Sequence, residues 1–144
     1  MKKLLLLFVS FLLLEACLTE GESEQTYRVV YKNEASATCR VIGFQVDNVI
    51  EFDQELSTDA SYTSCDYRAG VFIGDFCLDS IAFIFPNGKG YACDVRANNI
   101  GREFCFSDTR SPLVIQEGFS DLGNNTYQFT ITEEDFLNAK ELDK

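Results

Sequence analysis

The chain has 144 residues, with 12 Lys and Arg against 23 Asp and Glu and a formal net charge of −11. So acidic a chain repels nucleic-acid phosphates and anionic lipid headgroups, which argues against nucleic-acid binding and against flat adsorption to a membrane. It contains no His and no Trp, so the usual general base of nucleophilic triads and the commonest metal ligand are missing. These features favour a protein that is not an enzyme and needs no cofactor or metal.

The N-terminus predicts export. Lys2 and Lys3 precede an apolar run at residues 4–14. This run is too short for a membrane-spanning helix, which needs roughly 20 residues, but it matches the hydrophobic region of a signal peptide. Ala16 supplies a small side chain before the expected cleavage point. Residues 1–16 are therefore predicted to be a signal peptide.

Cys17 follows that cleavage point, and Leu14-Glu15-Ala16-Cys17 resembles the box at which bacterial lipoproteins are lipidated. The resemblance implies acyl chains on Cys17 that hold the protein in the cell envelope, with the outer membrane as the expected location on either its periplasmic or its external face. Two or more chains give stable attachment. Glu15 departs from the usual pattern, and an ordinary secretory signal that leaves Cys17 as a thiol is the alternative.

The mature chain divides into two parts. Residues 17–26 comprise the lipidated cysteine and a polar, acidic stretch that we expect to be a flexible tether. Residues 27–144 suffice for a single domain with one core. The chain's 13 Phe and six Tyr predict that this core is aromatic-rich and built from strands.

The cysteines indicate disulfides, as is usual for exported proteins. They are Cys17, Cys39, Cys65, Cys77, Cys93 and Cys105. If Cys17 is lipidated, at least one of the other five is unpaired. Equal separations of twelve residues suggest the bridges Cys65–Cys77 and Cys93–Cys105. Cys39 then remains as a free, buried thiol. Without a Cys-x-x-Cys pair, a metal site is the weaker interpretation.

Alternation of apolar and polar residues predicts strands over residues 27–32, 38–46, 49–56 and 61–67. The expected core-facing residues of the first two strands are Tyr27, Val29, Tyr31, Ile42 and Phe44. Turn residues at 33–36 predict that these two strands pair as a hairpin.

A second hairpin is expected from residues 80–85 and 91–95, with Ile81, Phe83 and Phe85 inward and a type I′ turn at Pro86-Asn87-Gly88-Lys89. Residues 118–125 are predicted to be a loop and residues 126–132 a strand. A short terminal helix should follow, capped by Thr132 and docked by Phe136 and Leu137. The whole pattern predicts an all-β fold, an antiparallel β-sandwich of immunoglobulin-like or similar type with a short C-terminal helix. A small closed β-barrel is the alternative.

Three segments and the signal together carry a resemblance. They are TYRVVYKN at residues 26–33, IAFIFPNGKGY at residues 81–91 and YQFTITEEDFLNA at residues 127–139. In this order they resemble the small, mostly uncharacterised β-rich lipoproteins common in Bacteroidota. The resemblance implies a lipoprotein signal followed by one β-sandwich domain, and it implies no catalytic residues.

The sequence thus predicts a non-enzymatic, lipid-anchored envelope protein that binds or assembles with another envelope component, a protein or a glycan. The alternative is a periplasmic inhibitor of a basic hydrolase such as lysozyme, which the acidic charge favours. Tyr62, Tyr67 and Tyr91 are candidates for exposed binding aromatics, with half-buried packing as the structural alternative.

Overall fold

The computed structural model describes residues 24–95, 105–106, 110–113 and 118–142. The strands are β1 (Gln25–Asn33), β2 (Cys39–Phe44), β3 (Ile50–Leu56), β4 (Ser61–Ala69), β5 (Ser80–Ile84), β6 (Lys89–Asp94), β7 (Phe119–Gly123), β8 (Thr126–Ile131) and β9 (Lys140–Glu141). A short 3-10 helix, η1 (Val46–Asn48), links β2 to β3, and the α-helix α2 (Glu133–Leu137) follows β8. The predicted signal peptide and Cys17 lie outside the described residues.

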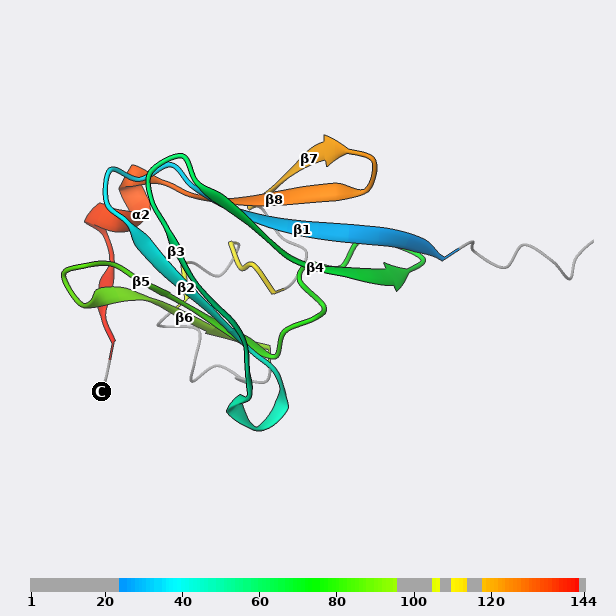
Figure 1. Ribbon diagram of the computed structural model, residues 1–144, viewed down its shortest axis with the longest axis horizontal. Coiled ribbons are helices and arrows are strands. Elements are labelled where there is room, and N and C mark those ends of the chain that lie inside the picture. Colours follow the sequence, from blue (N-terminus) through cyan, green and yellow to red (C-terminus); the bar gives the residue numbers. More distant parts are fainter. Residues whose placement is uncertain (1–23, 96–104, 107–109, 114–117, 143–144) are drawn as a thin grey trace, which may run out of the picture.

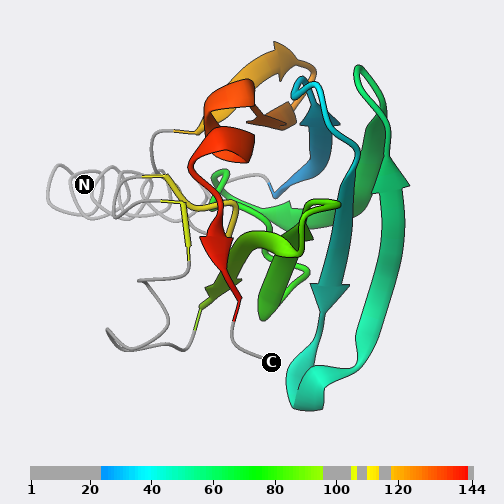
Figure 2. The same ribbon diagram turned by 90° about the vertical axis from the view of Figure 1, so that its left-hand side faces the viewer.

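The strands form two sheets that pack as two layers (Figure 1). One sheet has the order β4-β1-β8-β7 and the other the order β3-β2-β5-β6-β9. Neither sheet closes on itself within the described ranges, so the predicted sandwich is confirmed and the barrel is not formed. Figure 2 shows α2 leading into β9, which pairs with β6 at the edge of the second sheet. In the part of the chain that the structure describes, no helix has the length and hydropathy of a membrane span.

β1 lies in the middle of its sheet, antiparallel to β4 and parallel to β8. The predicted hairpin of β1 with β2 is therefore wrong. The pair β1–β8 is parallel, and the other strand pairs between described residues are antiparallel. Asn33 explains the crossing to the other layer. Its wholly buried amide donates to the carbonyls of Ala37 (2.9 Å) and Leu56 (2.8 Å) and accepts from the Ala35 N–H (3.1 Å). These bonds hold residues 33–37 as a bridge between layers instead of a tight turn.

The core lies between the inner faces of the sheets. Tyr27, Val29 and Tyr31 point into it as predicted. On β2 the core cluster contains Cys39 and Val41, whereas Ile42 is buried but lies outside this cluster and Phe44 is only half-buried. Apolar side chains stand on both faces of β2, so alternation alone could not choose the inner one. Gly43 leaves room for an aromatic ring, because a Cβ there would lie 2.4 Å from the Phe52 ring.

The β5–β6 hairpin is confirmed, with Ile81, Phe83 and Phe85 at most 2% exposed. Its turn is not of type I′. Among the turn residues only Gly88 has a positive φ, +80°, and its N–H donates to the Phe85 carbonyl at 2.9 Å. Because Pro86 fixes a negative φ, the chain makes a type I turn followed by a glycine bulge.

The C-terminal region corrects two further predictions. The expected loop at residues 118–125 contains the strand β7, which is joined to β8 by Asn124 and Asn125. Both have positive φ (52° and 57°), as a type I′ turn requires. The α2 helix has the predicted Thr132 cap, but only Phe136 docks, 5.2 Å from the Phe85 ring, while Leu137 is 73% exposed.

Candidate functional site

The structure contains the two predicted disulfides, and they differ in environment. Cys93 and Cys105 are 3% and 5% exposed, whereas Cys65 and Cys77 are only half-buried. Cys39 is a free, buried thiol, as predicted, and its burial raises its pKa to about 12. A thiol with so high a pKa is a poor nucleophile at neutral pH. Among the described cysteines, those of the Cys65–Cys77 disulfide are therefore the least enclosed by the fold.

A β-bulge places Cys65 on the inner face of β4. Arg28 pairs with Asp66 and Val30 with Thr63, so two residues of β4, Ser64 and Cys65, stand opposite one residue of β1. Both bulge residues are half-buried, and neither follows the simple alternation of a regular strand. Bulges re-aim side chains in this way and often lie beside functional sites.

The partner cysteine belongs to a loop at residues 70–79 that the structure fixes at several points. The Phe72 ring stacks on Tyr127 with 3.7 Å between centroids. The Ile73 N–H donates to the Tyr67 hydroxyl at 3.1 Å. The disulfide then ties the far half of the loop to β4. The loop therefore has one defined conformation although it contains no regular secondary structure.

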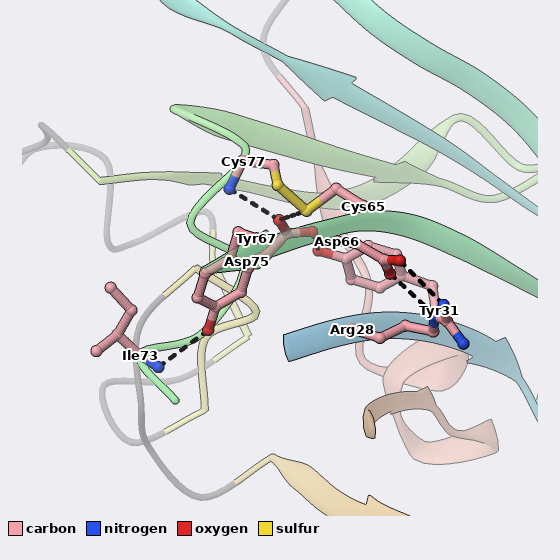
Figure 3. The surroundings of a disulfide bond; sticks show 8 residues. All are labelled: Arg28, Tyr31, Cys65, Asp66, Tyr67, Ile73, Asp75 and Cys77. Atoms are coloured by element: carbon pink, nitrogen blue, oxygen red, sulfur yellow. Dashed lines mark hydrogen bonds and ion pairs between the residues drawn. A yellow bond between two sulfur atoms is a disulfide. The ribbon is translucent and has the colours of Figure 1, made fainter. Parts of the chain in front are cut away.

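Asp75 is the central residue of this loop, and its side chain is wholly buried. The Tyr31 hydroxyl donates to Asp75 Oδ2 at 2.8 Å, and the Cys77 N–H donates to Oδ1 at 3.2 Å (Figure 3). Oδ1 also lies 3.4 Å from the Sγ of Cys65. Because a disulfide sulfur carries no proton, this last approach is a contact and not a hydrogen bond.

Burial raises the pKa of the Asp75 carboxyl above its ordinary value, and hydrogen bonding from Ser64, Tyr31 and the Cys77 N–H opposes part of the rise. Of these three groups, Ser64 is the one whose buried hydroxyl makes no hydrogen bond of normal geometry. None of the ion pairs between described residues includes Asp75. A buried carboxyl without a cation is unusual enough to mark a candidate functional site.

A pocket of about 410 Å³ opens beside this carboxyl, and we call it the Asp75 pocket. Its lining residues are Ile73, Asp75, Phe76, Cys77, Leu78, Asp79, Val95 and Leu113. Cys77 belongs to this lining, but Cys65 does not. Phe76 and Val95 are 67% and 51% exposed at its rim, so the pocket combines an apolar edge with an acidic floor.

The ligand atoms of Cys65, Asp75 and Cys77 lie within 4.8 Å of one another, which is a spacing that suits a metal ion. Zinc and other soft metals, however, bind cysteine as thiolate. Both sulfurs are committed to the disulfide, so the cluster is not a metal site in this structure.

The second buried carboxyl, Asp135, is fully accounted for by structural contacts. Arg110 donates to its carboxylate and to the Thr130 carbonyl, and the guanidinium lies 4.8 and 4.7 Å from the ring centroids of Phe106 and Phe129. The Asp135 carboxylate also accepts from the backbone N–H of the helix cap at 2.7 Å. A pocket of about 340 Å³ is present there, but its charged groups already hold α2 in place.

The three tyrosines singled out in the sequence are packing residues. Tyr67 and Tyr91 are 8% and 3% exposed, and half-buried Tyr62 packs on Phe52 with 4.9 Å between ring centroids. Sequence reasoning missed Asp75. The available signal was a single acidic residue within the apolar segment VFIGDFCL at residues 71–78, two positions before a cysteine.

Comparison of the chain with protein-family models, curated proteins and solved structures found no match.

Proposed function

We propose that the protein is a non-enzymatic binding module, anchored by acyl chains on Cys17 in the outer membrane, that recognises another envelope component through the Asp75 pocket. The observation that carries the proposal is the exposed Phe76 on an immobilised loop at the pocket rim. Large exposed aromatic residues of this kind are the usual energetic centres of protein interfaces.

The contacts that hold the loop at residues 70–79 support binding, because this loop would lose little conformational entropy when a partner associates with it. Phe76 lies between Asp75, whose carboxyl is held by two hydrogen bonds, and Cys77, which is held by the disulfide. Its ring also packs 6.0 Å from that of Tyr67. A preorganised side chain avoids much of the ordering cost of association.

The charge of the chain favours a basic protein as the partner. The formal net charge is −11, and Asp79 lies in the pocket lining beside the apolar rim. An apolar side chain flanked by Lys or Arg would match this arrangement, and the long-range field would accelerate its approach.

Site-specific photocrosslinking in cells tests the proposal. A photoreactive residue at position 76 should give a crosslink to an identified basic envelope protein, and one at position 137 should not. Leu137 is the matched control because it is equally apolar, 73% exposed and located in α2. Phe76→Ala should then weaken the purified complex at least tenfold, about 1.4 kcal/mol or more, and Leu137→Ala should leave it unchanged. Equal binding of both variants would contradict the pocket as the docking site.

The anchor has a separate test. Cys17→Ala should move the full-length protein from the membrane fraction to the soluble fraction, because the acyl chains are its only proposed attachment. The intact mass of membrane-extracted protein should include the acyl chains and two disulfides. Retention of the variant in the membrane would overturn the lipoprotein assignment.

The inhibitor alternative draws support from one edge of the sandwich. β3 is an edge strand that exposes Glu51, Asp53 and Glu55, so an acidic strip faces solvent there. A basic lysozyme should form a complex that weakens as salt rises, and Glu51→Gln with Glu55→Gln should abolish it. No inhibition at low salt would eliminate this alternative.

A further inference from the structure

The geometry points to Cys65–Cys77 as a site of thiol–disulfide exchange, in which a thiolate entering the Asp75 pocket attacks Cys77 and Asp75 protonates the departing Cys65. The external reactant is a dithiol, either a small molecule or the active site of a reductase. This inference is independent of the proposed binding function, because it requires neither Phe76 nor a protein partner.

The pocket selects which sulfur is attacked. Cys77 belongs to its lining and Cys65 does not, while the Sγ of Cys65 lies 3.4 Å from Oδ1 of Asp75. Exchange requires access of the nucleophile to one sulfur and departure of the other as thiolate. The structure therefore distinguishes an attacked sulfur from a leaving sulfur.

Asp75 is placed to handle the proton of the leaving sulfur. Oδ2 accepts from Tyr31, so Oδ1 is the oxygen that remains for Cys65, at 3.4 Å from Sγ. A thiolate formed next to a buried carboxylate would be strongly disfavoured. Proton transfer from a neutral Asp75 removes this obstacle, and burial raises the pKa of Asp75 in the direction that favours the neutral form.

The first step balances in atoms and charge. The external thiolate forms a bond to Cys77 Sγ, the Cys65–Cys77 bond breaks, and its electron pair passes to Cys65 Sγ. Asp75 gives its proton to that sulfur, leaving a mixed disulfide, a Cys65 thiol and an Asp75 carboxylate. The second thiol of the dithiol then loses its proton and attacks the external sulfur of the mixed disulfide, and Cys77 departs with the electron pair of the broken bond and takes up that proton. The dithiol is thereby oxidised and the protein disulfide is reduced.

Few titratable or charged groups can replace Asp75 in this role. Those that face it are Tyr31 on β1, Tyr67 on β4 and, in the pocket lining, Asp79. Burial raises the pKa of both tyrosines, so they stay protonated throughout the neutral range. Asp79 shares the pocket, and its substitution serves as the electrostatic control.

The first measurement locates the attack. Full-length protein is treated with glutathione, quenched with acid and mapped by peptide mass. The expected adduct is on Cys77, and with dithiothreitol Cys65–Cys77 should open at least tenfold faster than the buried Cys93–Cys105. An adduct on Cys65, or equal opening of the two bridges, would overturn the proposal.

The second measurement tests Asp75 through a pH profile. The rate of opening of Cys65–Cys77, divided by the thiolate concentration, should rise at least tenfold as pH falls through the raised pKa of Asp75, since general acid catalysis contributes at least that much. Asp75→Asn should flatten this profile to within about twofold. Asp79→Asn should keep it, because Asp75 is the carboxyl that lies 3.4 Å from the leaving sulfur.

If Asp75→Asn does not fold, Tyr31→Phe tests the same role of Asp75 and leaves the Asp75 carboxyl in place. Loss of the Tyr31 hydrogen bond removes a contact that favours the charged form of Asp75. The rise in rate should therefore begin at a higher pH than in the natural protein. A wild-type profile without pH dependence, or an unshifted one in Tyr31→Phe, would show that Asp75 has only a structural role.

Discussion

The two buried carboxyls of this sandwich occur in opposite settings. Asp135 is paired with Arg110 and caps a helix, and the other bridge, Cys93–Cys105, is fully buried, with the carbonyl of Cys105 accepting from Lys140. Asp75 has no cation among the described residues and touches a half-buried bridge that borders a pocket.

This difference distinguishes groups that stabilise the fold from groups that are placed for a reaction. In the Asp135 region the buried carboxylate has a cation, and these two groups hold α2 against the sheet. In the Asp75 region a buried carboxyl without a cation among the described residues contacts a half-buried disulfide, and these are the two groups that the proposed thiol–disulfide exchange would use. Ionisable groups in an unfavourable environment occur most often at functional sites.

Removing each disulfide should give the largest effect and the most direct comparison. Both bridges close loops of equal length, so chain entropy predicts the same loss, about 3 kcal/mol. Cys93→Ala with Cys105→Ala also leaves a core cavity, which should bring its loss to about 4–5 kcal/mol. Urea unfolding of both double variants measures this difference, and a larger loss for the Cys65–Cys77 pair would reverse the assigned roles.

Arg110→Met should cost about 3 kcal/mol of unfolding free energy, because it leaves the Asp135 carboxylate buried without its cation. Arg28→Met is the control, since the Arg28–Asp66 ion pair is exposed and should contribute little. If both variants unfold at the same urea concentration, the Asp135 region does not depend on charge pairing.

Asp75→Asn should have a smaller effect that depends on pH. A raised pKa in the folded state means that Asp75 contributes stability below its unfolded pKa and loses it as pH rises through the folded value. The variant does not titrate there, so its stability relative to the natural protein should increase from about pH 4 towards neutrality. Urea unfolding at several pH values checks the sign, and a relative decrease would mean that the folded pKa of Asp75 is lowered.

Cys39 should show the smallest effect, namely no labelling in the folded protein. With a pKa of about 12, only about one thiol in ten thousand is ionised at pH 8. Iodoacetamide should leave Cys39 unmodified until urea unfolds the chain, as read by peptide mass mapping. Native labelling of Cys39 would remove the contrast between this inert thiol and the reactive bridge.

Alternation predicted most strands but not their partners. Tyr27, Val29 and Tyr31 identify the inner face of β1 because the period of two is a local property. Pairing depends on distant segments, so the turn-like residues 33–36 wrongly suggested a hairpin, whereas the buried side chain of Asn33 directs the chain to the other layer.

The same limit applies to turns and to the candidate site. Asn-Gly at residues 87–88 favoured a type I′ turn, but the negative φ that Pro86 requires led to a different turn there. A type I′ turn is found at Asn124-Asn125. The disulfides followed from equal spacing. Asp75 could not be recognised, because its importance depends on contacts with Tyr31 and Cys65 that only the folded chain brings together.

The central position of β1 also makes its sheet depend on pairing between segments far apart in the chain. The chain is made from its N-terminus, yet β1 has its parallel neighbour only when residues 126–131 are present. Such long-range pairing makes folding slow. Both disulfides join cysteines only twelve residues apart, so each can close before β8 arrives. Such short-range bridges would constrain their own segments of the chain while the first sheet is still incomplete.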